Sequence, residues 1–380
     1  MVEKAEKEQK KVKKENPLQR RLEELRKEYS NTKYNKATNK HLGILRAKIA
    51  GVVKELNKRT GRKGTGINVK KSGDGTVVLV GPPNAGKSSL LNALAGVDSK
   101  VANYAFTTVS VIPGMLMWKG ARIQIFDMPG LIEGSHIGKG GGIRLGSVMR
   151  IADLVLFVVD ATDYNVLFNI MEELSALGIK VNKGKPKIKV EEVDSGGIEI
   201  ISNGNRTPQP EETVSILNEF GIYNAKVIFW ENSTAEDLFD FLTRNNVYVQ
   251  GFVVANKMDL IEKPAELAKE IRAKTGMPVV QTSALEQRNI EELKDAIFQN
   301  LELERVYLKP KDGQADYENP VIMKKGSSVS ELAKALHSDT VSQLRYALVN
   351  GSSARFKNQV CGPSHVLEDG DVVTLVYSKV

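Results

Sequence analysis

The stretch GPPNAGKS, from Gly81 to Ser88, decides the fold of this chain. It fits the pattern G-x-x-x-x-G-K-[ST], and it stands between the apolar run Thr76 to Val80 and the helical sequence SSLLNALAG. A glycine-rich turn between a buried strand and a helix lets backbone N–H groups surround a phosphate at the positive end of the helix. A chance glycine-rich turn is the alternative, and the flanking strand and helix argue against it. The stretch therefore predicts a phosphate-binding P-loop.

Residue types within the P-loop predict how a nucleotide and its metal ion are held. Lys87 is expected to reach the β- and γ-phosphates, and the Ser88 hydroxyl is expected to ligate Mg²⁺. We expect the turn and the start of its helix to line the nucleotide: Gly81, Pro82, Pro83, Asn84, Ala85, Gly86, Lys87, Ser88 and Ser89.

A second motif, DMPG from Asp127 to Gly130, follows the apolar run Arg122 to Phe126. At the end of a buried strand, Asp127 is placed to hold Mg²⁺, directly or through water. The Gly130 N–H is placed to sense the γ-phosphate. Alone this motif is only a turn signal, but its position after a P-loop makes it specific.

The sequence YAFTT, Tyr104 to Thr108, lies between these two motifs. A threonine hydroxyl here can ligate Mg²⁺ only while the γ-phosphate is present, which is how a switch loop reads the nucleotide state. We favour Thr108 over Thr107 for this role. Lys87, Thr108 and Gly130 are thus the residues expected to act on the transferred phosphate.

NKMD, Asn256 to Asp259, follows the apolar run Gly251 to Ala255 and predicts which base is read. The Asp259 carboxylate can accept hydrogen bonds from N1–H and the 2-amino group of guanine. Adenine offers no such donor pair and would leave the carboxylate unpaired. Lys257 is expected to pack its stem over the base, and Asn256 to tie this loop to the P-loop.

TSAL, Thr282 to Leu285, follows the next predicted strand. The Ala284 N–H is predicted to meet the guanine O6, with Ser283 and Leu285 beside it. Four motifs in this order, each at a strand end, predict a Mg²⁺-dependent site for GTP and GDP. An ATPase would leave NKMD unexplained.

Apolar runs alternate with helical patterns along the chain: Thr76–Val80, Arg122–Phe126, Leu154–Val159, Gly251–Ala255 and Pro278–Gln281. Strands that alternate with helices predict an α/β fold with a doubly wound sheet. The segment from Asp160 to Asn256 is too long for one crossover helix. Within it, Lys187–Val193 and Gly197–Ile201 look like strands around a Ser195-Gly196-Gly197 turn. We therefore expect a small α/β insert there.

The domain boundaries follow from these patterns. We expect a basic tail at 1–16, a helical hairpin at 17–60, a GTPase domain at 61–318 and a separate domain at 319–380. The insert is expected at about 165–245. The last domain is expected to contain a helix at Val329–His337 and a closing strand at Val372–Tyr377. The second hairpin helix carries apolar residues at alternating spacings of three and four: Leu42, Leu45, Ile49, Val52 and Leu56.

The charge is concentrated in one part of the chain. The net charge is +8, and residues 1–60 hold 18 Lys and Arg against 8 Asp and Glu. A basic arm of this kind suits RNA or an acidic partner, and a solvated tail is an equal alternative. Cys361 is the single cysteine, which suits a reducing compartment, and with no apolar leader or membrane-length run we expect a cytoplasmic protein.

These residues resemble the developmentally regulated GTP-binding proteins, in the Obg-like group of GTPases. DMPGLIEGSHIGKGGG resembles the extended switch II of that group, and NKATNKHLGILRAKIA resembles its N-terminal helical segment. NPVIMKKGSSVSELAKALH with HVLEDGDVV resembles a TGS domain, a ubiquitin-like β-grasp module. The resemblance implies binding to ribosomes or RNA and, in eukaryotic relatives, a dedicated protein partner.

Two positions bear on the rate of hydrolysis. Where Ras-like proteins carry a water-positioning glutamine after D-x-x-G, this chain has Leu131, so intrinsic hydrolysis should be slow. Asn84 stands where potassium-activated GTPases carry asparagine, and the resemblance implies that its oxygen ligates K⁺. A turn asparagine is an equal alternative.

We therefore expect a slow, K⁺-stimulated GTPase switch that acts as a monomer in translation or on ribosomes. The alternative is an RNA- or protein-binding scaffold with a mainly structural nucleotide site. Binding of the basic arm to a membrane ranks last, because the arm has no hydrophobic anchor.

Overall fold

The computed structural model describes residues 73–95, 112–128, 148–176, 178–243, 246–336 and 342–378, together with nine helical residues among the first 60. The chain divides into two compact units. Residues 1–65 and 184–246 form one unit, and residues 66–183 and 247–380 form the other.

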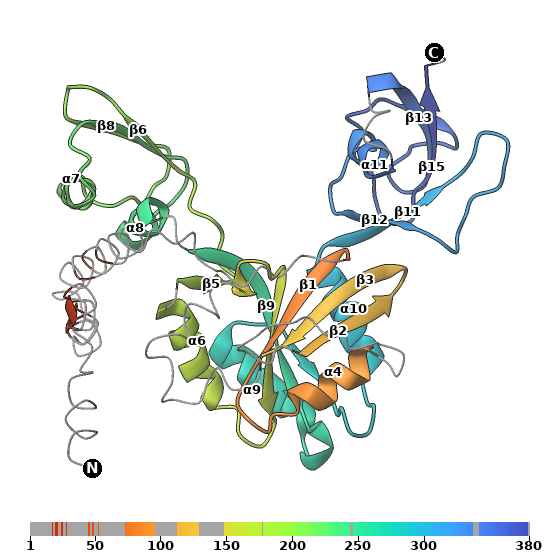
Figure 1. The fold of residues 1–380 in the computed structure, drawn as a ribbon, viewed down its shortest axis with the longest axis horizontal. Helices are drawn as coiled ribbons and strands as arrows, with labels where there is room; N and C mark the ends of the chain where they lie inside the picture. Colours follow the sequence, from red (N-terminus) through yellow and green to blue (C-terminus); the bar gives the residue numbers. More distant parts are fainter. Residues whose placement is uncertain are drawn as a thin grey trace, which may run out of the picture. The chain divides into compact units, whose positions relative to one another are not determined.

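The second unit is built on a seven-stranded sheet with the order β10-β9-β4-β1-β3-β2, and β5 pairs with β9 (Figure 1). Its strands are β1 (Gly75–Val80), β2 (Ile112–Trp118), β3 (Ala121–Asp127), β4 (Leu154–Asp160), β5 (Ile179–Val181), β9 (Val247–Asn256) and β10 (Val279–Gln281). Every neighbouring pair is parallel except β2 with β3. β1 and β4 are buried almost throughout, as strands covered on both faces must be. The predicted doubly wound α/β sheet is confirmed.

Helices cover both faces of this sheet. They are α4 (Lys87–Ala95), α6 (Val166–Ala176), α9 (Pro264–Thr275) and α10 (Ile290–Asn300), with the short 3₁₀-helix η2 (Met258–Leu260). Val77 and Leu79 of β1 pack in the core formed with α4 and α10. Val78 and Val80 pack in the opposite core, formed with α6 and α9. Because successive side chains of a strand point to opposite faces, one strand supplies both cores and is held from both sides.

The insert forms its own small sheet and core in the other unit. Its elements are β6 (Ile188–Glu192), β7 (Ile198–Ser202), α7 (Pro210–Glu219), β8 (Ala225–Phe229) and α8 (Ala235–Thr243). The sheet order is β6-β8-β7. The two predicted strands exist, but β8 lies between them, antiparallel to β6 and parallel to β7. The Ser195-Gly196-Gly197 turn therefore does not join two paired strands.

The start of the insert differs from the expectation of about residue 165. Residues 166–181 belong to the main sheet, because α6 contributes Leu167, Ile170 and Leu174 to its core and β5 pairs with β9. The insert unit begins at Gly184. The crossover between β4 and β9 therefore contains its own helix as well as the insert.

The C-terminal domain is a five-stranded sheet with the order β12-β11-β15-β13-β14, packed against one helix. Its elements are β11 (Leu303–Leu308), β12 (Val321–Lys324), α11 (Val329–Leu336), β13 (Leu344–Asn350), β14 (Gln359–Cys361) and β15 (Val372–Tyr377). The expected start at residue 319 is too late, because β11 pairs with both β12 and β15. The domain thus takes its first strand directly after α10.

The predicted basic tail, residues 1–16, lies outside the described residues, as does most of the hairpin. Within the hairpin, Leu45 and Val52 of the predicted seam are helical and buried. None of the helices among the described residues has the length and apolar character needed to cross a membrane.

Candidate functional site

The predicted motifs that the structure describes meet at one edge of the main sheet. β1 runs into Gly81, β3 ends at Asp127, β4 at Asp160 and β9 at Asn256. Strand register aligns these ends, since Leu79 lies beside Asp127 and Asp160 lies beside Asn256. Ligands of doubly wound sheets bind in the crevice outside the carboxyl ends of the strands. The fold therefore brings three sequence-distant motifs, the P-loop, DMPG and NKMD, to one site together with Asp160.

Backbone carbonyls of the P-loop accept hydrogen bonds from the lysine of the same loop. The Lys87 ammonium donates hydrogen bonds to the carbonyl oxygens of Gly81 at 2.9 Å and Pro82 at 2.8 Å. A Cβ on Gly81 would lie 2.0 Å from the Val158 carbonyl oxygen, so the loop can start only with glycine. Asn84 has a φ of 61°, in the left-handed region that asparagine tolerates. The turn thus holds a positive charge where a phosphate would lie.

Ser88 and Asp127 lie together, as the magnesium assignment requires. The Ser88 hydroxyl donates a hydrogen bond to Asp127 Oδ2 at 2.7 Å. Asp127 is fully buried, and among the described residues its other oxygen, Oδ1, has no hydrogen-bond partner. A buried carboxylate oxygen without a donor is costly. An oxygen-preferring divalent cation is the ligand that fits this pair.

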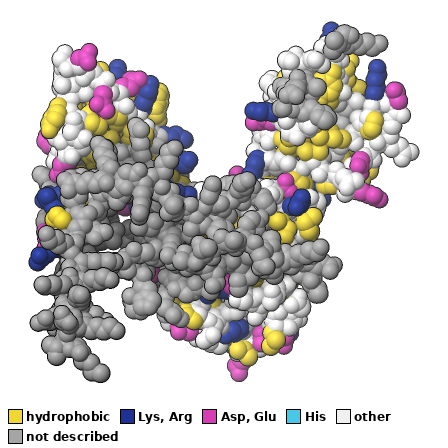
Figure 2. Space-filling model, viewed as in Figure 1, with side chains coloured by type: hydrophobic (Ala, Val, Ile, Leu, Met, Phe, Trp, Pro, Cys, Tyr) yellow, Lys and Arg dark blue, Asp and Glu magenta, His cyan; other side chains and the backbone are white. Residues whose placement is uncertain are grey.

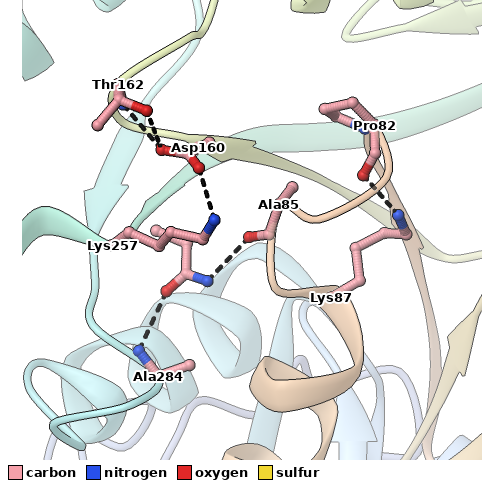
Figure 3. Close-up of polar contacts among 8 residues, drawn as sticks. Pro82, Ala85, Lys87, Asp160, Thr162, Lys257 and Ala284 are labelled. Atoms are coloured by element: carbon pink, nitrogen blue, oxygen red, sulfur yellow. Dashed lines mark hydrogen bonds and ion pairs between the residues drawn. The ribbon is translucent and has the colours of Figure 1, made fainter.

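Asn256 joins three loops through one buried side chain. Its Nδ2 donates to the Ala85 carbonyl at 2.9 Å, and its Oδ1 accepts from the Ala284 N–H at 3.0 Å (Figure 3). The predicted tie between this loop and the P-loop is present. A Cβ on Gly86, whose φ is 84°, would lie 2.3 Å from Asn256 Nδ2. Glycine at this position therefore admits both the turn and the amide.

The same contact engages a group that was predicted to recognise the base. The Ala284 N–H, which was expected to meet guanine O6, is engaged by Asn256 Oδ1. The neighbouring Leu285 lies 87% exposed, and its N–H makes no hydrogen bond within the described part of the chain. Leu285 N–H is therefore a donor of this loop without a partner in the described part of the chain. Ser283 is fully buried and accepts from the Glu286 N–H at 3.2 Å, so it shapes the loop.

The Asp259 carboxylate, which is predicted to read the base, has an oxygen available to hydrogen-bond donors. Asp259 lies in η2, whose start is tied to the adjacent loop by the Met258 N–H, which donates to the Thr282 carbonyl at 3.1 Å. Asp259 Oδ1 is buried and lacks a partner among the described residues. The N1–H and 2-amino groups of guanine are the pair of donors that such a carboxylate accepts.

Asp160 is a site residue that the sequence did not single out. Its Oδ2 accepts from the Lys257 ammonium at 2.6 Å (Figure 3). Its Oδ1 accepts from the N–H and hydroxyl of Thr162, at 2.9 and 2.7 Å. Burial raises the pKa of Asp160, but the hydrogen bonds from Lys257 and Thr162 outweigh it and hold that pKa below its usual range. Its position at the end of the apolar run LVLFVV, beside NKMD in the sheet, was the available signal.

Several predicted site residues lie outside the described residues: Tyr104, Thr107, Thr108, Gly130 and Leu131. Their roles remain predictions. Pro83, Asn84, Ser88 and Ser89 are exposed at the site edge, while Ala85 and Lys87 are buried.

Comparison with known proteins agrees with this geometry. A protein-family model described as a 50S ribosome-binding GTPase matches residues 76–203, and a model of the C-terminal region of that domain matches 195–303. A TGS-domain model matches residues 304–377, the span of the C-terminal sheet.

Similar proteins cover nearly the whole chain. A GTP-binding protein of Methanocaldococcus jannaschii is 40% identical over 365 residues, which are 95% of this chain and 92% of the relative. The developmentally-regulated GTP-binding protein 1 homolog of Dictyostelium discoideum is 40% identical over 371 residues, covering 94% and 99%. Human developmentally-regulated GTP-binding protein 2 is 36% identical, with coverage of 94% and 98%. The solved YchF GTPase of Schizosaccharomyces pombe has a TM-score of 0.47 at 13% identity, covering 81% of this chain and 99% of that structure.

The Asp259 carboxylate generates the first prediction. In Asp259→Asn, the amide places a donor where guanine also offers donors, so affinity for GDP should fall by about 10- to 100-fold. Xanthosine diphosphate, with a 2-oxo group, should gain affinity instead. Titration of both nucleotides checks this, with the exposed Glu262→Gln as a control that should bind GDP normally. An unchanged preference for GDP in Asp259→Asn would show that another group reads the base.

Proposed function

Because the chain belongs to the family of developmentally regulated GTP-binding proteins, P-loop GTPases that hydrolyse GTP, we propose that it works with Mg²⁺ and K⁺ as a slow switch on the ribosome or RNA. The observation that carries the metal-dependent part is the Ser88–Asp127 pair, with a buried carboxylate oxygen that lacks a donor among the described residues.

Different residues of this chain are proposed to hold the metal ion, to bind the phosphates and to sense the γ-phosphate. Ser88 and Asp127 would hold Mg²⁺, and Thr108 is proposed to join them in the GTP state. Lys87 is proposed to release the Gly81 and Pro82 carbonyls and to turn to the β- and γ-phosphates. The metal ion supplies positive charge that neutralises the charge developing during phosphoryl transfer. The Gly130 N–H is proposed to sense the γ-phosphate and to couple its presence to switch II.

The rate of the switch is proposed to depend on a monovalent cation. Leu131 cannot orient a nucleophilic water, which supports slow intrinsic hydrolysis. Asn84 lies exposed in the P-loop with its backbone in the left-handed region. Its side-chain oxygen would hold K⁺, which supplies part of the positive charge that an arginine finger gives elsewhere.

The partner is proposed to be ribosomal or other RNA. The basic arm supports this, because residues 1–60 carry 18 Lys and Arg against 8 Asp and Glu. Figure 2 shows charges of both signs interspersed over the described surface on the visible face, without a comparable single-sign field. The name of the matching family model, which mentions the 50S ribosome, supports the same partner. A dedicated protein partner, a monomeric state and a cytoplasmic location complete the proposal.

The magnesium assignment predicts the behaviour of Ser88→Asn. An amide cannot replace the small hydroxyl as a metal ligand at the helix start, so steady-state GTP hydrolysis in Mg²⁺ should be lost while the fold remains. Phosphate release and circular dichroism measure the two. Ser175→Asn, at an exposed position of α6, should hydrolyse GTP normally. Normal turnover in Ser88→Asn would refute the assignment.

The potassium assignment predicts that KCl accelerates single-turnover hydrolysis relative to NaCl at constant ionic strength. Na⁺ is smaller and would make longer, weaker contacts in a K⁺-sized site. Because Asn84 has a positive φ, Asn84→Gly keeps the backbone unstrained and removes only the amide. This variant should lose the potassium effect. Equal rates of the wild type in both salts contradict the cation, and an effect that survives in Asn84→Gly contradicts Asn84 as its ligand.

The basic arm predicts salt-sensitive binding to RNA. Each phosphate contact releases counterions, so affinity for ribosomes should fall steeply between about 50 and 200 mM salt. Removal of residues 1–16 should have a modest effect, because their lysines are offset by glutamates. Neutralising Arg20, Arg21, Lys48 and Lys54 as well should cost more. Cosedimentation with ribosomes measures this, and binding that ignores both salt and these changes would contradict the arm's role.

A further inference from the structure

The carboxylate of Asp160 lies beside the base-reading loop because of strand register. β4 and β9 are parallel neighbours with Asp160 aligned to Asn256. The Ala161 N–H donates to the Asn256 carbonyl at 2.9 Å, which extends the pairing past the end of β4. A side chain at this position therefore faces the residue that follows Asn256.

Two features distinguish that residue, Lys257: an ion pair of its side chain and an unusual backbone conformation. Its ammonium contacts Asp160 Oδ2 at 2.6 Å, and its backbone has a φ of 62°, a region that non-glycine residues rarely adopt. The two side chains are only 33% and 22% exposed, so the ion pair is partly shielded from water. A pair in this setting restrains a long side chain better than one on the open surface.

The turn after β4 restrains the Asp160 carboxylate independently of Lys257. Thr162 donates its N–H and its hydroxyl to the same oxygen, Oδ1. The Asp163 N–H donates to the Asp160 carbonyl at 3.0 Å, which closes the turn. Oδ1 is thus taken by the turn, and Oδ2 is left pointing at the lysine (Figure 3).

We propose that Asp160 is a positioning residue for guanine recognition, which acts through Lys257. It holds the stem of Lys257 in place to cover the base and stabilises the left-handed residue from which η2 and Asp259 start. The hydrogen bonds and ion pair of the Asp160 side chain within the described residues go to Lys257 and Thr162 and not to the P-loop. Its contribution therefore belongs to nucleotide affinity and not to phosphoryl transfer.

Asp160→Asn tests the proposal in the full-length protein. The amide keeps the shape but loses the charge, so a fluorescent GDP analogue should bind about three- to tenfold more weakly. Asp163→Asn, on the same turn and exposed, should bind as the wild type does. The single-turnover rate at saturating GTP should stay within about twofold, because the phosphate site is unchanged.

A double-mutant cycle separates positioning from a general structural role. In a Lys257→Met background, Asp160→Asn should cause no further loss of affinity, because its action passes through the missing ammonium. Thermal melting without nucleotide should differ little between Asp160→Asn and the wild type. Unchanged affinity in Asp160→Asn, additive losses in the cycle, or a lower single-turnover rate with normal affinity would each overturn the proposal.

Discussion

The buried amide of Asn256 is the interaction on which the nucleotide site depends. It is 2% exposed, and it links the Ala85 carbonyl of the P-loop to the Ala284 N–H of the last motif. These loops are far apart in the chain, and the Ala85 carbonyl and the Ala284 N–H both find their partner in the Asn256 side chain. A buried amide that satisfies both loops fixes their separation, because losing either contact would leave a buried polar group unpaired. Phosphate and base recognition are thereby held in one frame.

The relative positions of these loops in turn depend on the parallel sheet. The strand order β10-β9-β4-β1-β3-β2 places the ends of β9, β4, β1 and β3 side by side. Two cores hold the sheet from opposite faces, so the ends cannot shift independently. Asn256 and Asp160 are neighbours only because β4 and β9 are in register. The insert and the C-terminal sheet have separate cores and contribute no residue to the described contacts among these loops.

The parts predicted correctly from the sequence were those that local chemistry determines. The P-loop pattern requires glycine where the Gly81 backbone meets Val158, and the buried strands β1 and β4 are continuous apolar runs. Long-range pairing was harder to foresee. β11 has mixed burial and resembles a connection until β12 and β15 are known to pair with it. Asp160 was missed for the same reason. Its partner Lys257 is distant in the sequence and lies beside it only because β4 and β9 pair.

The hydrogen bond of Ala284 shows why even a recognised motif needs the fold. The motif places this N–H near the base, but the chain contains an acceptor, Asn256 Oδ1, that competes for it at 3.0 Å. Nothing in the letters TSAL reveals that competition, since the acceptor comes from another strand.

The site keeps two carboxylate oxygens without donors among the described residues, Asp127 Oδ1 and Asp259 Oδ1. Asp127 ends β3, where a cation would lie, and Asp259 lies in η2, where the base would lie. Leaving such atoms unpaired destabilises the chain without ligand, and proteins accept this at functional sites. A ligand that satisfies both atoms recovers that free energy on binding. Nucleotide should therefore stabilise the folded domain as well as occupy it, because a ligand that binds only the native state shifts the folding equilibrium by mass action. The cost of burying these two oxygens and the affinity for a ligand that pairs with them then have the same origin.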